Sequence, residues 1–449
     1  MNSLAGKQLI RIAVTGLLVL TFMGCNGSKK SPEAGAAQGN AQGTVTLKFF
    51  SASPDRQSGI GLVEQMIIDQ YVKENPQVKI EVEALQDEPY KQKFKAYVAG
   101  NELPDIFHVW SYTAFFKPVM DGGYAAELNP NDYNNYKYLA KALDGFKDTG
   151  GKLYGLSKAA DFYVVYYNKK IFADNNIEVP TTYEDLINIT KKLRANGVSP
   201  CAINGKDEWS IGSLYNDVYY KEEGSSDLIN SVSLTESKFV DHPVFLKTAN
   251  AFKQLMDAGF FQNSFSSADY GAARNLFIQG RTAMYYMGSW EVGLQSDSSV
   301  PKEFLDNVSA FRFPAPASSK GKATDLLGAY GGGFSVSSSS PNKEAAIKFL
   351  NYMMKPDNWA KLSWQTGGSF PSQDVTDYIT GTETPLQLTV VDILKTSTSL
   401  SGQNFNEVSA PSFKTDAQSI CGTFANGLLT PAKFLEELDK AAAVAAKQL

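Results

Sequence analysis

The sequence predicts an α/β fold in which helices and mostly parallel strands form two lobes. Patterns of strand and helix alternate near the start of the chain, and the same alternation returns in its middle. The 449 residues are too many for one small core, since domains usually hold about 100 to 200 residues. With 43% hydrophobic and 20% charged residues, the composition is that of an ordinary globular protein.

The first 24 residues are predicted to be a signal peptide for export. Lys7 and Arg11 make a basic region without acids, and residues 12–23 make an apolar region that is too short to span a bilayer. Cys25, which follows Gly24, resembles the lipobox cysteine of bacterial lipoproteins, where the signal is cut before the cysteine and the thiol carries a lipid. Phe22 stands where that family usually has leucine. An ordinary signal peptide followed by an incidental cysteine is the alternative.

Residues 26–43 predict a flexible tether, because they contain no large apolar side chain to bury. Such a tether would hold the folded body outside the cell, near the membrane but free of it. Cleavage before Cys25 would leave 425 residues and change the net charge from −5 to −7, since the removed segment carries two positive charges. No other stretch of the sequence is long and apolar enough to span a bilayer.

Charge and cysteine content narrow the chemistry further. Nucleic acid is not an expected partner, because no segment of this acidic chain clusters lysine and arginine. Cys201 and Cys421 could form a disulfide in an oxidising compartment. Their wide separation and isolated contexts favour two unpaired, mostly buried thiols instead.

The first part of the folded region follows the order strand, helix, strand, helix, strand. Apolar and polar residues alternate in the strands, and apolar residues recur at helical spacing in the helices. The segments are strand 45–50, helix 60–71, strand 78–83, a helix that contains residues 94–98 and ends at Gly100, and strand 106–110. This order is typical of a parallel sheet with right-handed crossovers, in which ligands bind beyond the carboxyl ends of the strands.

The middle of the chain repeats this pattern. Residues 162–167 form a strongly apolar run that predicts a strand. Thr181 and Glu184 predict a capping box at the start of the next helix. Residues 331–336 predict a further strand, and Pro341 is expected just inside the start of the helix that follows.

Five short motifs in the folded region occur in an order that matches one known family. They are Leu103-Pro104-Asp105-Ile106, Tyr166-Tyr167-Asn168-Lys169, Gly288-Ser289-Trp290, Gly332-Gly333-Phe334-Ser335-Val336 and the stretch from Ser340 to Ala346. A weaker match is Gly367 to Ser372. The order of these motifs resembles the extracellular solute-binding proteins of sugar ABC importers, the family of the maltose-binding protein. The resemblance covers about everything after residue 44.

The resemblance implies a type II periplasmic-binding-protein-like fold with a ligand cleft between two α/β lobes. Residues 44–156 and 331–382 would form lobe 1, and residues 157–330 and 383–449 would form lobe 2. It also implies a monomer, lipid-anchored through Cys25 on the extracytoplasmic face of the bacterial cell membrane. This monomer would deliver a sugar or oligosaccharide to ABC permease subunits that work with a cytoplasmic ATPase. No cofactor is implied.

Three tryptophans are candidates for sugar stacking, because sugars present flat patches of ring C–H beside their hydroxyls. Trp290 follows the short apolar run within residues 279–290, which is typical of a strand buried on both faces of a parallel sheet, and the family places a ligand-stacking aromatic there. Trp110 ends a strand of the opposite lobe, and Trp209 lies in a loop where the family brings another aromatic to the sugar. The alternative for each is a large core residue. Two further tryptophans, on or just after a helix, are expected to be packing residues: Trp359 and Trp364.

Polar candidates follow from the same resemblance. Asp161 precedes the strand at residues 162–167, where the family places an acid or amide that accepts sugar hydroxyls, and a carboxylate makes the stronger, charge-assisted bonds. Asp55 and Arg56 match a polar contact loop of the family, with a solvated turn as the alternative. Weaker candidates are Tyr90, Ser111, Ser289, Gly331 and Gly332.

The sequence gives little support to an enzyme. It contains no nucleophile elbow, phosphate-binding loop, His-Glu-x-x-His or Cys-x-x-Cys motif. Its two histidines are His108, expected to be packed in a strand, and His242, expected in a loop, so neither a histidine-based triad nor a zinc site is predicted. A glycoside hydrolase needs only two carboxylates and stays as a minor alternative. Glu102 and Asp105 frame a turn and are expected to be structural.

Two other functions stay open for the same fold. The ligand could be a non-sugar solute, such as a glycerol phosphodiester, an opine or a peptide fragment. A phosphate would need a basic cleft, and Arg56 is the one candidate that the sequence places there. Alternatively, the protein could be a lipid-anchored adhesion or ligand-sensing module that presents its loaded form to a receptor instead of a permease.

Overall fold

The computed structural model describes residues 44–448, so the predicted signal peptide, the lipidation site Cys25 and the tether at residues 26–43 lie outside the described residues. The first of two large sheets has the strand order β2-β1-β3-β11-β4. Its strands are β1 (Val45–Ser51), β2 (Val78–Ala84), β3 (Ile106–Trp110), β4 (Leu156–Ser157) and β11 (Gly332–Val336). Each strand predicted in this part of the chain is present.

The second sheet has the order β10-β5-β7-β6, with β8 also paired to β5. Its strands are β5 (Asp161–Asn168), β6 (Ser199–Ala202), β7 (Thr282–Gly288), β8 (Val308–Phe311) and β10 (Gly328–Ala329). A two-stranded sheet joins β9 (Asp325–Leu326) to β12 (Ser399–Leu400). All seven residues of β7 are buried, as the apolar run in the sequence predicts.

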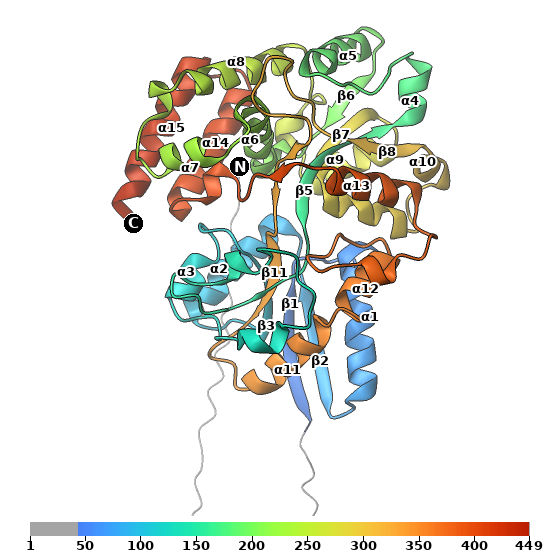
Figure 1. Cartoon of the computed structure of the whole chain (residues 1–449), viewed down its shortest axis with the longest axis vertical. Coiled ribbons are helices and arrows are strands. Elements are labelled where there is room, and N and C mark those ends of the chain that lie inside the picture. Colours follow the sequence, from blue (N-terminus) through green and yellow to red (C-terminus); the bar gives the residue numbers. More distant parts are fainter. Residues whose placement is uncertain (1–43, 449) are drawn as a thin grey trace, which may run out of the picture. The chain divides into compact units, whose positions relative to one another are not determined.

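Helices flank both sheets, and Figure 1 shows α1, α2 and α11 beside the strands of the first sheet. The first sheet region contains α1 (Gly59–Glu74), α2 (Asp87–Gly100), α3 (Lys117–Asp121), α11 (Lys343–Met353) and α12 (Trp359–Gln365). The other helices are α4 (Lys169–Asp174), α5 (Tyr183–Ala195), α6 (Trp209–Glu223), α7 (Asp227–Ser233), α8 (Pro243–Asp257), α9 (Tyr270–Ile278), α10 (Lys302–Asn307), α13 (Pro385–Lys395), α14 (Pro411–Ala425) and α15 (Pro431–Ala445).

Both sheets are mixed, whereas mostly parallel sheets were expected. β1 runs parallel to β2 and β3, but β11 runs antiparallel to β3, with Gly332 opposite Trp110. In the second sheet β7 is parallel to β6 and antiparallel to β5. The reason is connectivity, since β11 enters the first sheet directly from the second instead of returning through a helical crossover.

Two short connections carry the chain between the sheets. β4 ends at Ser157 and β5 begins at Asp161, while β10 ends at Ala329 and β11 begins at Gly332. The backbone N–H of Gly332 donates to Asp161 Oδ2 at 3.1 Å, which ties the two connections together. The predicted lobe boundaries at residues 156, 330 and 382 stay a prediction.

Two predicted helix starts are wrong by one or two residues. The capping box at α5 uses Thr182 and Asp185 instead of Thr181 and Glu184, because the Asp185 carboxylate accepts from Thr182 N while Thr182 Oγ1 accepts from Asp185 N. Helix α11 begins only at Lys343, after the N-cap Asn342, so Pro341 precedes the helix instead of lying inside it.

The core confirms several packing expectations. Trp359 and Trp364 are 0% and 2% exposed. Cys201 and Cys421 are buried free thiols, and burial raises the pKa of both. Asp105 is buried and structural, since its carboxylate accepts from Lys48 N at 2.7 Å and also from the Ser340 hydroxyl. No helix among residues 44–448 is both long and apolar enough to cross a bilayer.

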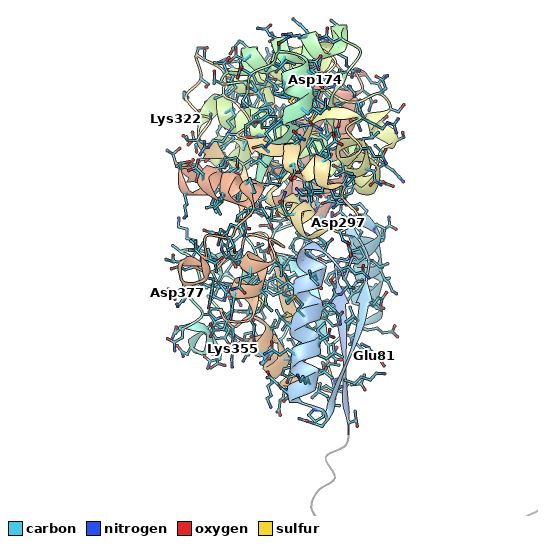
Figure 2. The ribbon with its side chains drawn as sticks, turned by 90° about the vertical axis from the view of Figure 1, so that its right-hand side faces the viewer. Glu81, Asp174, Asp297, Lys322, Lys355 and Asp377 are labelled. Carbon is cyan, nitrogen blue, oxygen red and sulfur yellow. The ribbon has the colours of Figure 1, made fainter. Side chains whose placement is uncertain are left out.

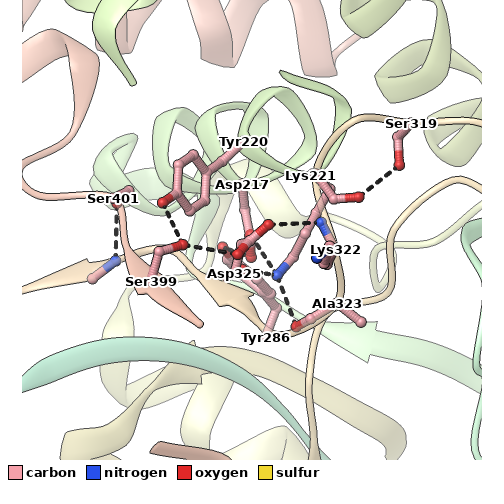
Figure 3. Close-up of polar contacts among 12 residues, drawn as sticks. Asp217, Tyr220, Lys221, Tyr286, Ser319, Lys322, Ala323, Asp325, Ser399 and Ser401 are labelled. Carbon is pink, nitrogen blue, oxygen red and sulfur yellow. Dashed lines mark hydrogen bonds and ion pairs between the residues drawn. The ribbon is translucent and has the colours of Figure 1, made fainter. Parts of the chain in front are cut away.

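A buried polar cluster fixes the segment that leads into β9 and β10 (Figure 3). Lys221, 1% exposed on α6, donates from Nζ to the carbonyl oxygens of Ala323 (3.2 Å) and Asp325, and it lies 3.9 Å from Asp217 Oδ1. The Asp325 carboxylate accepts from Ser399 Oγ at 2.8 Å. Lys322, labelled in Figures 2 and 3, donates its backbone N–H to the same carboxylate at 2.8 Å. Helix α6 thereby holds the segment that leads into β9 and β10.

The cluster predicts a specific pH dependence of stability. Burial raises the pKa of Asp217 to about 6 from 3.8, against the lowering effects of Lys221 and the Tyr286 hydroxyl. The folded state therefore binds the Asp217 proton more tightly than the unfolded state does. The stability that this proton contributes is complete below pH 3.8 and is lost as the pH rises to about 6. We expect the free energy of unfolding of the wild type to fall, relative to Asp217→Asn, by on the order of 3 kcal/mol across this window. Urea denaturation at several pH values measures this difference, and parallel pH profiles would contradict it.

Candidate ligand-binding site

A cavity of about 420 Å³ lies where the two connections between the sheets pass. On the side of the first sheet it is lined by the loop after β1, the start of α2 and the end of β3. On the side of the second sheet it is lined by the starts of α6 and α9 and by the 3₁₀ helix Ser289–Ser296 that follows β7. This position, beyond the carboxyl ends of β1 and β3, is where α/β sheets usually bind ligands, and the volume is that of a small-molecule site.

Trp290 and Trp209 form an aromatic wall on the second-sheet side of the cavity. Their ring centroids lie 6.3 Å apart at 58°, and Tyr163 meets Trp290 edge-on at 5.6 Å. Both indoles are half-buried and line the cavity. The Trp290 ring fills the space beside the backbone of Gly288, where a Cβ would lie 2.0 Å from Cζ3 of the indole. Trp209 is the first residue of α6 and not part of a loop as expected.

Trp110 forms the aromatic surface on the opposite side. It lies at the end of β3 and packs edge-on against Tyr90 at 5.6 Å and His108 at 4.3 Å. Lys91 Nζ lies 5.2 Å from the centroid of the indole, within the range of a cation–π contact. Burial first and the charge of Lys158 second hold the pKa of His108 well below its usual value, so the imidazole is neutral.

A hydrogen bond joins the two sides of the cavity. Trp209 Nε1 donates to Asp87 Oδ2 at 2.6 Å, and Asp87 Oδ1 also pairs with Lys91 at 2.8 Å. Although burial lowers the pKa of Lys91, the charges of Asp87 and Glu88 raise it above its usual range. Asp87 therefore connects the start of α2 to the start of α6 and keeps Lys91 charged beside Trp110.

Two further cavity cations, Arg274 and Lys414, are paired as well. Arg274 contacts Glu291 at 3.2 Å and Asp297 at 2.9 Å, and Asp297 is labelled in Figure 2. Burial raises the pKa of Glu291, while Arg274 and a hydrogen bond from the Tyr270 hydroxyl oppose this rise. On the other side, Lys414 pairs with Glu407 at 2.7 Å.

Six predicted site residues line this cavity, and the structure brings them together from both sheet regions: Trp290, Trp110, Trp209, Asp161, Asp55 and Gly332. Asp55 lies at the exposed rim, where its carboxylate accepts from Gln57 N at 2.8 Å and Ser58 Oγ at 2.5 Å. Asp161 lies inside, and burial raises the pKa of its carboxyl against the lowering effects of Lys158 and the Gly332 N–H.

Arg56 and Tyr90, also predicted as site residues, are not in the lining. The Arg56 guanidinium pairs with the fully buried carboxylate of Glu64, which draws it into the protein. Tyr90 is 0% exposed, stacks on Phe50 with ring centroids 4.1 Å apart, and donates its hydroxyl to the His108 carbonyl at 2.6 Å. Tyr90 therefore supports Trp110 from beneath instead of facing the cavity.

Ser111, Ser289 and Gly331 are likewise outside the lining. Ser111 Oγ donates to the carbonyl oxygen of Tyr330 at 3.1 Å. Ser289 is fully buried and donates to the Ala160 carbonyl at 3.0 Å. At Gly331 a Cβ would lie 2.4 Å from the Tyr112 hydroxyl, so the glycine makes room for that tyrosine. All three fix the connections between the sheets instead of facing the cavity.

The sequence interpretation missed most of the charged lining. The missed residues with charged or hydroxyl-bearing aromatic side chains are Asp87, Lys91, Tyr112, Lys158, Tyr163, Tyr270, Arg274, Glu291, Glu407 and Lys414. Two of them carried a local signal, because Tyr163 lies in a predicted strand next to Asp161 and Glu291 directly follows Trp290. Glu407 and Lys414 come from the C-terminal region, and nothing in their local sequence points to the cavity.

Residues 57–358, more than half of the chain, match the family described as bacterial extracellular solute-binding protein. The chain belongs to this family. The resemblance drawn from the five motifs is thereby confirmed, and the family consists of binding proteins of transporters and not of enzymes.

This solute-binding protein is similar to characterised proteins over most of its length. It is 21% identical to the multiple sugar-binding protein of Streptococcus mutans over 77% of this chain and 78% of the relative. A solved structure from work on xylan utilization by Caldanaerobius polysaccharolyticus has a TM-score of 0.81 and 26% identity, covering 88% of this chain and 99% of the other. A chitin oligosaccharide binding protein has a TM-score of 0.78 and 22% identity, covering 90% and 99%. The predicted two-lobed binding-protein fold is thus confirmed.

Proposed function

We propose that this solute-binding protein captures a carbohydrate, an oligosaccharide by preference, in the 420 Å³ cavity and delivers it to an ABC permease. The observation that carries the proposal is the pairing of indole surfaces with hydrogen-bonding groups. Trp290 and Trp209 face the cavity from one side and Trp110 from the other. The flat faces of the indoles suit the apolar faces of sugar rings, and the polar groups of the lining suit the hydroxyls.

Charge in the cavity argues against the phosphate alternative. Arg56, the cation that the sequence suggested for a phosphate, is paired with Glu64 and is absent from the lining. Lys91, Arg274 and Lys414 each have a carboxylate partner, and the charge of the remaining cavity cation, Lys158, is opposed by the nearby carboxylates of Glu64 and Asp161. A doubly charged phosphate would have to displace these carboxylates or bind beside them, and both are unfavourable in a half-dry cavity.

The cellular setting belongs to the proposal as well. Lipid attachment at Cys25 would hold a monomer on the extracytoplasmic face of the membrane, where permease subunits with a cytoplasmic ATPase receive the ligand. The names of the relatives support the solute class, since they concern multiple sugars, chitin oligosaccharide and xylan. If no transporter subunit binds the loaded protein, we expect that a receptor binds it in place of a permease.

Thermal denaturation of the full-length protein in detergent tests the ligand class. The panel contains maltotriose, raffinose, xylotriose, chitotriose, glycerol 3-phosphate and a tripeptide. We expect at least one neutral sugar to stabilise the protein, because binding to the native state adds RT ln(1 + [L]/Kd), about 2.7 kcal/mol at a hundred times Kd. The same sugar should shift the tryptophan emission. A response to glycerol 3-phosphate or the tripeptide without any response to sugars would contradict the proposal.

A further inference from the structure

Lys158 is an unpaired cation in the cavity lining. Its side chain is 5% exposed, and no carboxylate of residues 44–448 lies within 4 Å of its Nζ. The three other lysines and arginines of the lining are all paired, and His108 is neutral. A buried ammonium without a carboxylate or hydrogen-bond partner is costly, which makes Lys158 the outstanding feature of this cavity.

The backbone holds Lys158 firmly in place. Its N–H donates to the Gly332 carbonyl at 2.9 Å, and its own carbonyl accepts from Trp359 Nε1 at 2.6 Å. The ammonium lies 5.2 Å from the centroid of the Phe334 ring, which supports the charge from one side. Burial lowers the pKa of Lys158, and the charges of Glu64 and Asp161 oppose that effect. The side chain thus enters the cavity from a fixed point.

Asp161 and Glu64 are the two acids whose charges act on this cation, and Asp161 is the one without a cation partner of its own, since Glu64 pairs with Arg56. A Cβ on Gly332 would lie 3.1 Å from Lys158 Cε and 3.4 Å from Asp161 Oδ2. The two atoms are therefore at most 6.5 Å apart, the sum of 3.1 and 3.4 Å. The only hydrogen bond to the Asp161 carboxylate within the described residues comes from Gly332 N–H. Gly332 leaves open the space between an ammonium donor and a carboxylate acceptor.

A single hydroxyl group can bridge the two side chains, because no ion pair joins them and Gly332 leaves the space beside them open. An N–H···O bond followed by an O–H···O bond spans about 4 to 5.5 Å between the outer atoms. A hydroxyl can accept from an ammonium and donate to a carboxylate at once, which an ionised carboxylate or a doubly ionised phosphate cannot do. The opposite charges of Lys158 and Asp161 also balance each other. An anionic ligand would attract Lys158 but would be repelled by Asp161.

We propose that Lys158 is a ligand-binding residue that, with Asp161, holds one hydroxyl of a neutral sugar and selects against uronates and phosphates. This inference rests on the proposed carbohydrate function and adds the charge class of the sugar. Charge-assisted hydrogen bonds of this kind are the stronger ones, so the pair sets both affinity and specificity. Gly332 is part of the arrangement, because a side chain there would fill the gap.

Isothermal titration of the full-length protein in detergent tests the inference. The neutral probes are maltotriose, raffinose, xylotriose and chitotriose, and the anionic probes are trigalacturonate and glycerol 3-phosphate. We expect the wild type to bind a neutral probe and neither anion. Lys158→Met and Asp161→Asn should each reduce the affinity for the neutral probe at least tenfold. In the double variant the loss of affinity should be smaller than the product of the two single losses, since both residues hold the same hydroxyl.

Controls separate binding from folding. Lys320→Met, at an exposed lysine paired with Glu223, should bind like the wild type. Melting without ligand shows that each variant is folded, and Lys158→Arg, which keeps the charge, should bind more tightly than Lys158→Met. If neutral sugars bind the wild type and Lys158→Met equally well, the inference is wrong while the proposed function stands. If trigalacturonate binds the wild type more tightly than the neutral probes do, and Asp161→Asn increases its affinity further, the proposed selection for neutral sugars is wrong. If no sugar binds the wild type, both this inference and the proposed function are wrong.

Discussion

Replacing Gly288 by alanine should abolish most ligand binding while the protein stays folded. The backbone at Gly288 has φ −80° and ψ 167°, which alanine adopts freely. Its Cβ, however, would lie 2.0, 2.2 and 2.4 Å from three atoms of the Trp290 indole. These distances are too short for a small shift of the rigid indole to relieve the clash. The ring must therefore leave its place in the cavity wall.

The expected loss of affinity is at least tenfold, because an aromatic surface that contacts the ligand is displaced. The free energy of unfolding should fall by about 1 to 3 kcal/mol, the usual cost of overpacking. Isothermal titration with the sugar found in the thermal panel measures the affinity, and urea denaturation measures the stability. The matched control is Gly271→Ala in the same lining, where the nearest atom is Asp269 Oδ1 at 3.9 Å.

The double variant decides whether Trp290 carries the effect. In Trp290→Ala the indole is gone, so adding Gly288→Ala should change the affinity by less than twofold. This non-additivity is expected of two positions in direct contact. If Gly288→Ala weakens binding equally with and without the indole, the glycine acts through another part of the wall. Wild-type affinity in Gly288→Ala would show that Trp290 has no contact with the ligand.

Replacing Lys221 by methionine should cause the largest loss of stability. Its ammonium is 1% exposed, donates to two backbone carbonyls and lies 3.9 Å from the equally buried Asp217 (Figure 3). Methionine has a similar length but no donor, so the carbonyls and Asp217 lose their partner together. Removing one member of a buried pair costs about 3–5 kcal/mol, because an uncompensated charge is left behind.

Urea denaturation without ligand, monitored by circular dichroism, measures this loss. Lys320→Met is the matched control, since Lys320 is 73% exposed and pairs with Glu223 at the surface. A surface pair of this kind is worth about 0 to 1 kcal/mol. The double variant Lys221→Met, Asp217→Asn should recover part of the stability, because it removes the uncompensated carboxylate. Equal effects of Lys221→Met and Lys320→Met would contradict the assigned role of the cluster.

Local patterns predicted the elements well. The alternation at residues 45–50 and 78–83, the helical spacing at 60–71 and the apolar run before Trp290 each correspond to an element of the structure. The reason is that these periods depend on neighbours in the sequence and on one buried face. Helix starts were less secure, as the shift from Thr181 to Thr182 at α5 shows, because adjacent threonines offer the same cap.

The aromatic residues of the cavity could be predicted, but most of its polar partners could not. Trp290 and Trp110 follow strands, and strand ends mark the ligand edge of an α/β sheet. Arg56 was expected in the cavity, yet Glu64 on α1, eight residues later, takes its guanidinium. Lys158 carries no local signal, since a single lysine between a serine and an alanine is usually a surface residue.

The sequence by itself determined the α/β class, the strands and helices, the buried tryptophans and thiols, and the family, because each depends on local periodicity or on motifs in order. Only the tertiary structure decided which side chains share the cavity. It brought Glu407 and Lys414 to the same cavity as Lys91, and it placed Asp161 beside Lys158 across Gly332. The physical reason is that these neighbours are set by two antiparallel crossings between the sheets, which join residues more than a hundred positions apart.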